Sequence, residues 1–169
     1  MPYFKQFPII NYSLDGARTA FQVTDFFRRV KADKGNVETS LAYYQYLIRD
    51  GETPDNLAVN IYGNSEYHWV LLVINEIIDP RWDWPMMGNT LLQYVETKYG
   101  VNAALATHHY ENADGDTVHV SYAGTKTSIT NYDYEDGLNE VRRNIKILKP
   151  RFLAEFVESF MVKVKENNG

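Results

Sequence analysis

The sequence predicts an α+β fold with a small core of strands and helices. Residues 41–48 (LAYYQYLI) are aromatic and branched, which is typical of a strand. Residues 53–75 then contain the start and stop signals of two short helices. Residues 152–164 place apolar side chains at positions i, i+1, i+4 and i+5, which predicts an amphipathic helix near the C-terminus.

The two helices after the first strand have clear local signals. Thr53 caps the first helix, Pro54 stands at its first position, and Asp55 places a negative charge in its first turn. Gly63 supplies its flexible C-terminal stop. The second helix begins at residues 65–66 (SE) and is apolar on more than one face, so we expect it to be largely buried.

The N-terminal region has weaker signals. Residues 1–20 contain two Pro and no sustained periodicity, which indicates an extended arm that becomes ordered by docking on a surface. Residues 24–25 (TD) offer a cap for a short helix at residues 26–31, and residues 34–36 (KGN) end it.

The segment after the core holds a loop, a helix and a hairpin. Residues 79–88 (DPRWDWPMMG) are bounded by Pro and contain two of the three Trp, which predicts an aromatic loop. Residues 90–99 have helical spacing. Residues 105–111 and 117–123 flank an Asp-Gly turn, which indicates a β-hairpin.

The sequence leaves one later segment ambiguous. Residues 132–139 are acidic and enter a helix through residues 140–143. Residues 144–150 (NIKILKP) alternate like a strand, although a continued helix is nearly as consistent with them. We therefore expect four parts: an N-terminal arm with a short helix (1–40), a core (41–80), an insertion (81–143), and a last strand with the C-terminal helix (144–169).

Composition and charge exclude several classes of protein. The chain has 169 residues and no Cys, so it has no disulfide scaffold, thiolate metal site or cysteine nucleophile. We expect it either to remain in a reducing cytosol or to be indifferent to redox conditions. Residues 1–50, 51–130 and 131–169 carry net charges of +2, −7 and 0. The acidic middle disfavours nucleic-acid binding and suits a basic protein partner. The longest apolar run, residues 69–74, is too short to cross a membrane.

No motif predicts catalysis or a bound cofactor. The common nucleophile, zinc-protease and phosphate-loop patterns are absent. His108 and His109 are neighbours on a predicted strand, so we expect them to point to opposite faces, and they cannot both face His119 to bind a metal. Asp79 and Asp83 are explained as a solvated pair in a loop. We therefore expect no enzyme activity, no metal and no cofactor.

The aromatic residues are the best candidates for partner contacts. Tyr62 and Trp69 have the spacing of core residues, whereas Trp82 and Trp84 lie in a Pro-bounded loop. Those two Trp either contact a partner or pack against the helix at residues 90–99, and the sequence supports both alternatives equally. The candidate partner interface consists of Phe4, Phe7, Trp82, Trp84, Met86, Phe156 and Phe160.

Residues 43–75 resemble a LysM domain. The resemblance rests on the Gly-Glu-Thr turn at residues 51–53, the Tyr-Gly pair at residues 62–63 and the Asn after the second helix. It implies a β-α-α-β core, and many members of that family bind glycans that contain N-acetylglucosamine. We expect residues 144–150 to supply the closing strand, after an insertion. The corresponding glycan cleft would contain Gly51, Glu52, Thr53, Asn75 and Asp79.

A larger part of the chain resembles the LysM-containing baseplate wedge proteins of contractile-tailed bacteriophages. The similarity covers most of residues 23–160 and is densest at residues 50–85, including DGETP at 50–54, IYGN at 61–64, HWVLL at 68–72 and DWP at 83–85. Later matches include LNE at residues 138–140 and KP at 149–150.

This second resemblance implies a non-enzymatic virion protein that connects wedge subunits around the tail hub. Its partners would be other wedge proteins and sheath-initiating or hub-proximal tail proteins, with several copies in a symmetric assembly. It would lie in the tail baseplate and, during assembly, in the host cytoplasm, without nucleic acid or membrane as a partner. A module that binds peptidoglycan or chitin-type glycans is the alternative, and a cell-wall hydrolase is a distant third.

Overall fold

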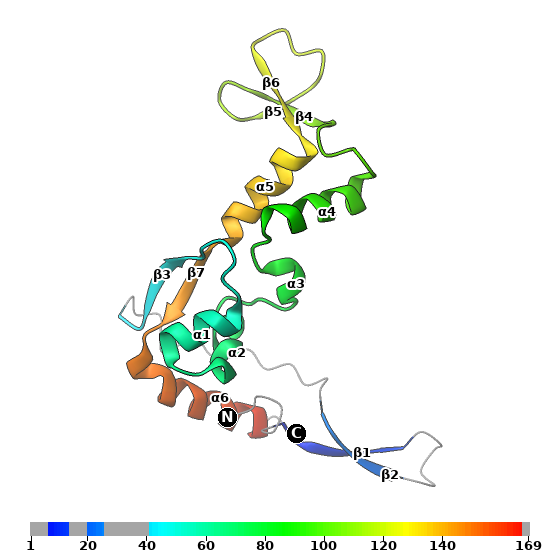
Figure 1. Cartoon of the computed structure of the whole chain (residues 1–169). Coiled ribbons are helices and arrows are strands. Elements are labelled where there is room, and N and C mark those ends of the chain that lie inside the picture. The colour runs from blue at the N-terminus through cyan, green and yellow to red at the C-terminus, as the bar shows by residue number, and fades with distance from the viewer. Residues whose placement is uncertain (1–6, 14–19, 26–40, 167–169) are drawn as a thin grey trace. The chain divides into compact units, whose positions relative to one another are not determined.

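The computed structural model describes residues 7–13, 20–25 and 41–166 and confirms the α+β fold class (Figure 1). The chain forms two compact units. The first consists of Met1–Tyr46, Glu52–Ile78 and Ile145–Gly169, and the second of Leu47–Gly51 and Asp79–Asn144. The predicted division of the chain into four parts and the likeness of its core to LysM stay predictions.

A two-stranded sheet joins segments that lie far apart in the sequence. Strand β3 (Tyr43–Leu47) pairs with strand β7 (Asn144–Leu148). At one end the Lys149 N–H donates to the Ala42 carbonyl, and at the other the Ile48 N–H donates to the Arg143 carbonyl, so the strands are antiparallel. Residues 144–148 are therefore a strand and not a continued helix, and the pairing expected of them is observed.

Two helices follow β3. The first has the limits that the sequence predicts, whereas Asn64, and not residues 65–66, caps the turn before the second. Helix α1 (Pro54–Tyr62) begins after Thr53, and the backbone at Gly63 is left-handed, with φ of 75°. The Gly63 N–H donates to the Val59 carbonyl and closes the last turn. The short 3-10 helix η2 (Ser65–Tyr67) leads into α2 (His68–Ile74), which is largely buried as expected.

The C-terminal helix completes the core of the first unit. After the 3-10 turn η3 (Pro150–Phe152), helix α6 (Leu153–Glu166) places Phe160 against Trp69, with ring centroids 5.0 Å apart. Phe156 stacks on the same Trp at 6.2 Å. The apolar stripe of α6 thus packs on α2 of its own chain. The buried residues of this core are Phe7, Ala42, Trp69, Val70, Ile74, Leu148, Phe160, Met161 and Val164.

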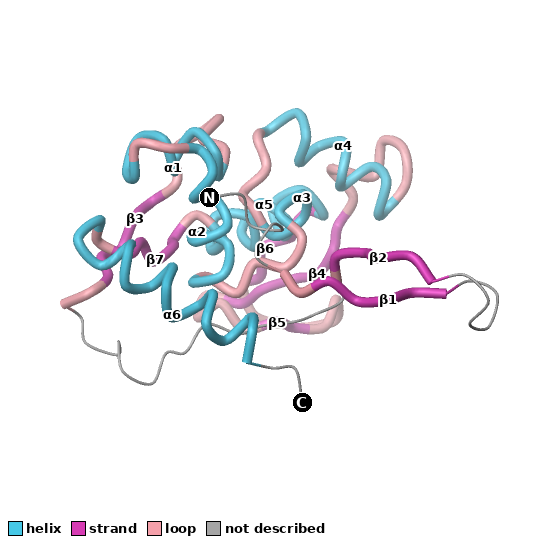
Figure 2. Tube along the Cα trace, turned by 90° about the horizontal axis from the view of Figure 1, so that it is seen from below, coloured by secondary structure: helices cyan, strands magenta, loops and turns pink. Residues whose placement is uncertain are grey.

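The second unit combines two long helices with a small sheet (Figure 2). Helices α4 (Gly88–Tyr99) and α5 (Asn131–Arg142) enclose a core of Met86, Leu91, Val95 and Ala104. Strands β4 (Thr107–Asn112) and β5 (Thr117–Val118) form the predicted hairpin. Strand β6 (Lys126–Thr130), which was not predicted, pairs with the other edge of β4.

The aromatic segment at residues 79–88 differs from the predicted loop. Pro80–Asp83 forms the short helix α3, whose first N–H groups are capped by Asp79. Trp84 follows it and is 6% exposed, and Met86 two residues later is also buried. Asp79 before the helix and Pro80 at its first position are helix-start signals, and they explain why these residues form a helical turn although the segment has the composition of a loop.

The described part of the N-terminal arm is extended and forms two strands. Strands β1 (Ile9–Ser13) and β2 (Ala20–Thr24) form an antiparallel hairpin. Both strands are rich in branched and aromatic residues, which favour extended pairing. The predicted helix at residues 26–31 lies outside the described residues.

Candidate functional site

The five residues of the predicted LysM-type cleft belong to both units, and each is described within its own. Glu52, Thr53 and Asn75 lie in the first unit, and Gly51 and Asp79 lie in the second. A glycan site needs polar side-chain atoms that are available to sugar hydroxyl groups. The hydrogen bonds of these five residues therefore bear directly on the predicted activity.

Asn75 uses its carboxamide to bind the backbone of strand β7. Its Nδ2 donates to the carbonyls of Lys146 and Leu71, both at 2.8 Å, and its Oδ1 accepts the Lys146 N–H at 2.8 Å. An amide side chain has two N–H donors, and both are used here. Asn75 at the end of α2 thus takes the place that a further strand would occupy beside β7.

Tyr62 extends the same arrangement along β7. Its hydroxyl group donates to the Leu148 carbonyl at 3.1 Å. Burial raises the pKa of Tyr62, and the nearby Tyr44 adds to the effect, so the hydroxyl keeps the proton that it donates. The backbone groups of Lys146 and Leu148 point away from β3, because successive residues of a strand direct their N–H and carbonyl groups to alternate sides. Tyr62 at the end of α1 and Asn75 after α2 therefore cover the outer edge of β7 with side-chain hydrogen bonds.

The other cleft residues of the first unit also have partners within it. The Tyr46 hydroxyl donates to the Glu52 carboxylate, at 2.8 Å to Oε1 and 2.9 Å to Oε2. Thr53 precedes the first residue of α1 in an extended conformation. A hydrogen bond with the Thr53 side chain lowers the pKa of Asp55. These contacts fix the start of α1 relative to β3.

The two cleft residues of the second unit have backbone roles. Gly51 has φ of 81°, a left-handed conformation that favours glycine, and forms the turn after β3. Asp79 accepts the Arg81 N–H at 3.1 Å and also binds the Arg81 guanidinium group, through Nε at 3.0 Å and Nη2 at 2.9 Å. These hydrogen bonds with Arg81 lower the pKa of Asp79. Asp79 therefore starts α3.

The predicted partner residues differ greatly in exposure. Trp82 is 50% exposed, and its ring lies 5.6 Å from that of Tyr94. Phe156 is partly buried, and Phe4 lies outside the described residues. The remaining four are buried: Phe7, Trp84, Met86 and Phe160. A role of any of these residues at an interface stays a prediction, and among the described ones the Trp82 side chain is the most exposed.

Sequence reasoning missed a buried polar stripe on α5. Asn131, Glu135 and Asn139 are spaced four residues apart and are all buried. Asn139 binds the Met86 backbone in both directions, with its Oδ1 accepting the N–H at 2.7 Å and its Nδ2 donating to the carbonyl at 3.1 Å. Asn131 donates to the Ala103 carbonyl at 2.8 Å. The i, i+4, i+8 spacing of three polar residues was the available signal.

Glu135 is the charged member of that stripe. Lys98 Nζ and the Tyr99 hydroxyl both donate to its Oε1 at 2.7 Å. Burial acts to raise the pKa of Glu135, but the hydrogen bonds from Lys98 and Tyr99 outweigh it, so the net pKa is lowered. The hydrogen bond with Glu135 raises the pKa of Lys98. A buried carboxylate with two donors thus joins α5 to α4.

The expectation that His108 and His109 point to opposite faces of their strand was wrong. His108 and His109 turn toward each other, and their Nδ1 atoms lie 2.8 Å apart. The register of β4 against β6 shifts between Thr107 and His109, and a bulge of this kind breaks the strict alternation of faces. The His108 ring stacks on Tyr134 with centroids 4.0 Å apart. Among the described residues, no group of three His, Cys, Asp or Glu side chains could hold a metal ion.

Asn75→Asp should destabilise the first unit by about 1–3 kcal/mol, because two carbonyl oxygens would face a carboxylate instead of an amide donor. Asn56→Asp introduces the same charge at an exposed position of α1 and should have a small effect. The free energy of unfolding in urea measures both. Equal stability of Asn75→Asp and the unmodified chain would contradict the role assigned to Asn75.

Glu135→Gln should cost about 1–2 kcal/mol of stability near neutral pH, because the charge that binds Lys98 is lost. The folded-state pKa of Glu135 lies below its ordinary value of 4.5, so its stabilisation is present above that pH and disappears as pH falls through the folded-state value. Urea unfolding at a series of pH values should show the two proteins converging in acid. The exposed control Glu158→Gln should follow the unmodified chain, and a pH-independent difference for Glu135→Gln would contradict the assignment.

In the part of the chain that the structure describes, no helix has the length and apolar character needed to cross a membrane.

Comparison with known proteins agrees with the resemblance seen in the sequence. The chain is 25% identical over 172 residues to the baseplate wedge protein gp53 of Enterobacteria phage T4, and the match covers 87% of this chain and 86% of that protein. The family model described as base plate wedge protein 53 matches residues 3–116, which is more than half of the chain. The chain therefore belongs to the base plate wedge protein 53 family.

Proposed function

We propose that the chain is a non-enzymatic subunit of a phage tail baseplate that connects wedge proteins around the tail hub. The family match over residues 3–116 carries this proposal. The partners are other wedge proteins and sheath-initiating or hub-proximal tail proteins. The chain is assembled in the host cytoplasm and takes its place, in several copies, in the virion baseplate.

The hydrogen bonds of the candidate cleft support a structural role over glycan binding. Asn75, the residue best suited to bind a sugar, has both its donors and its carbonyl oxygen engaged by Leu71 and Lys146. Glu52 accepts from Tyr46, and Asp79 binds Arg81. A sugar would have to displace these intramolecular partners, at a cost in the stability of the fold.

The surface of the second unit supports a protein partner. Residues 47–51 and 79–144 include eleven acidic and six basic side chains, which gives this unit a net charge of −5. Trp82 is half-exposed beside Tyr94 on this acidic unit. Trp is strongly enriched among residues that dominate binding energy, and an acidic surface favours a basic partner. Trp82 is therefore the best candidate for a contact of this unit with a neighbouring wedge protein.

Peptidoglycan binding is the alternative and is separated from the proposal by one assay. The isolated protein should stay in the supernatant when insoluble peptidoglycan is sedimented. Specific retention that free N-acetylglucosamine oligomers compete away would favour the glycan-binding function.

Trp82→Ala should lower the amount of the chain in purified tails by about tenfold or more, because truncation of a dominant interface Trp costs about 2 kcal/mol or more. The isolated variant should stay folded, since the Trp82 side chain is half-exposed. Quantitative mass spectrometry of tails from phage that carry the variant measures incorporation. Val101→Ala removes an exposed apolar side chain of the same unit and serves as the control. Normal incorporation of Trp82→Ala would remove Trp82 from the interface.

A further inference from the structure

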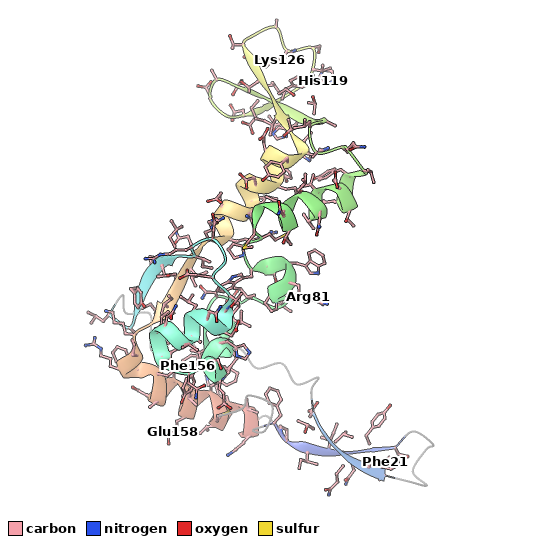
Figure 3. All side chains as sticks on the ribbon, viewed as in Figure 1. Phe21, Arg81, His119, Lys126, Phe156 and Glu158 are labelled. Carbon is pink, nitrogen blue, oxygen red and sulfur yellow. The ribbon has the colours of Figure 1, made fainter. Side chains whose placement is uncertain are left out.

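The hairpin of β1 and β2 has one apolar face. Ile10 pairs with Val23 and Tyr12 pairs with Phe21 across the two strands. Side chains two residues apart on a strand share a face, so these four lie together. They are 40%, 37%, 52% and 55% exposed, respectively. Figure 3 shows the Phe21 side chain projecting from β2.

A hairpin of this kind is not stable by its own contacts. Within the described residues, the sheet that contains β1 and β2 has two strands. A two-stranded hairpin in water is marginally stable at best and needs a further strand or a packed surface. Exposing an aromatic cross-strand pair to water also forfeits the free energy that its burial would contribute. The apolar face is therefore built to be covered.

The chemistry of the hairpin defines what covers it. The ten residues of Ile9–Ser13 and Ala20–Thr24 include no charged side chain. Recognition here relies on apolar burial and shape, in contrast to the acidic second unit, which suits a basic partner. The matching surface is consequently apolar and uncharged.

The area of the face decides between a second copy and a different protein. Tyr12 and Phe21 are about half-exposed, and with Ile10 and Val23 the face presents on the order of 300–400 Å². A stable pair of proteins buries about 800 Å² on each partner. Two free copies therefore have too little surface for a stable dimer through this face. It fits one contact of a larger interface.

We propose that the face formed by Ile10, Tyr12, Phe21 and Val23 docks on an apolar, uncharged surface of another baseplate wedge protein. The inference rests on the proposed function, because it takes the partner from the assembly in which the chain is placed. The hairpin anchors the chain to that protein, and the interface is completed by other contacts of the chain. Since no charge takes part, the contact persists at high salt.

Photo-crosslinking in the assembled particle tests the docking directly. Phe21→benzoylphenylalanine places the reactive group on the apolar face, and Gln22→benzoylphenylalanine places it on the opposite face of the same strand. After irradiation of purified tails, mass spectrometry should identify a crosslink from position 21 to another wedge protein, and at least a tenfold weaker one from position 22.

The possible outcomes separate this inference from the proposed function. If the chain is present in tails but position 21 crosslinks to a second copy, to its own chain, or to nothing, the docking inference is wrong and the baseplate role stands. If the chain is absent from tails, both are wrong. Tyr12→Ser combined with Phe21→Ser should lower incorporation by about tenfold, whereas Asn11→Ser combined with Gln22→Ser should leave it unchanged.

Discussion

The pairing of β3 with β7 is the constraint on which the first unit depends. These strands are separated in the sequence by residues 48–143, so the chain must close a long loop before the two-stranded sheet can form. Two strands alone give little stability. Asn75 and Tyr62 supply what a third strand would have supplied, because they bind Lys146 and Leu148 on the outer edge of β7. The C-terminal helix then covers α2 through Phe160 and Trp69.

The second unit uses the same device in a different setting. Asn139 binds both backbone groups of Met86, as Asn75 binds both backbone groups of Lys146. In each case one carboxamide satisfies an N–H and a carbonyl that regular secondary structure leaves open. Polar side chains thus hold the backbone from within, while Trp82 and the apolar face of the hairpin stay exposed. This distribution supports the proposed structural role.

Local signals predicted the elements whose ends are set locally, and tertiary contacts decided the rest. Helix α1 was predictable because Pro54 and Gly63 determine its limits through backbone geometry. Residues 144–150 stayed ambiguous because their strand conformation depends on β3, far away in the sequence. Burial of Trp84 and the pairing of β6 with β4 likewise depend on tertiary contacts. In the candidate site, the residue type predicted that Asn75 follows the second helix, but it did not predict the hydrogen-bond partner of Asn75. That partner is the backbone of Lys146, 71 residues later.

A reconstruction of the assembled tail at side-chain resolution tests the central claim most directly, namely that the Asn75 carboxamide holds β7 within the fold while exposed Trp82 contacts a partner. We expect the chain in the baseplate with Asn75 bonded to Lys146 in every copy and Trp82 covered by a neighbouring protein. A reconstruction in which Asn75 is released from Lys146 to face a ligand, or in which Trp82 faces solvent, would contradict the account.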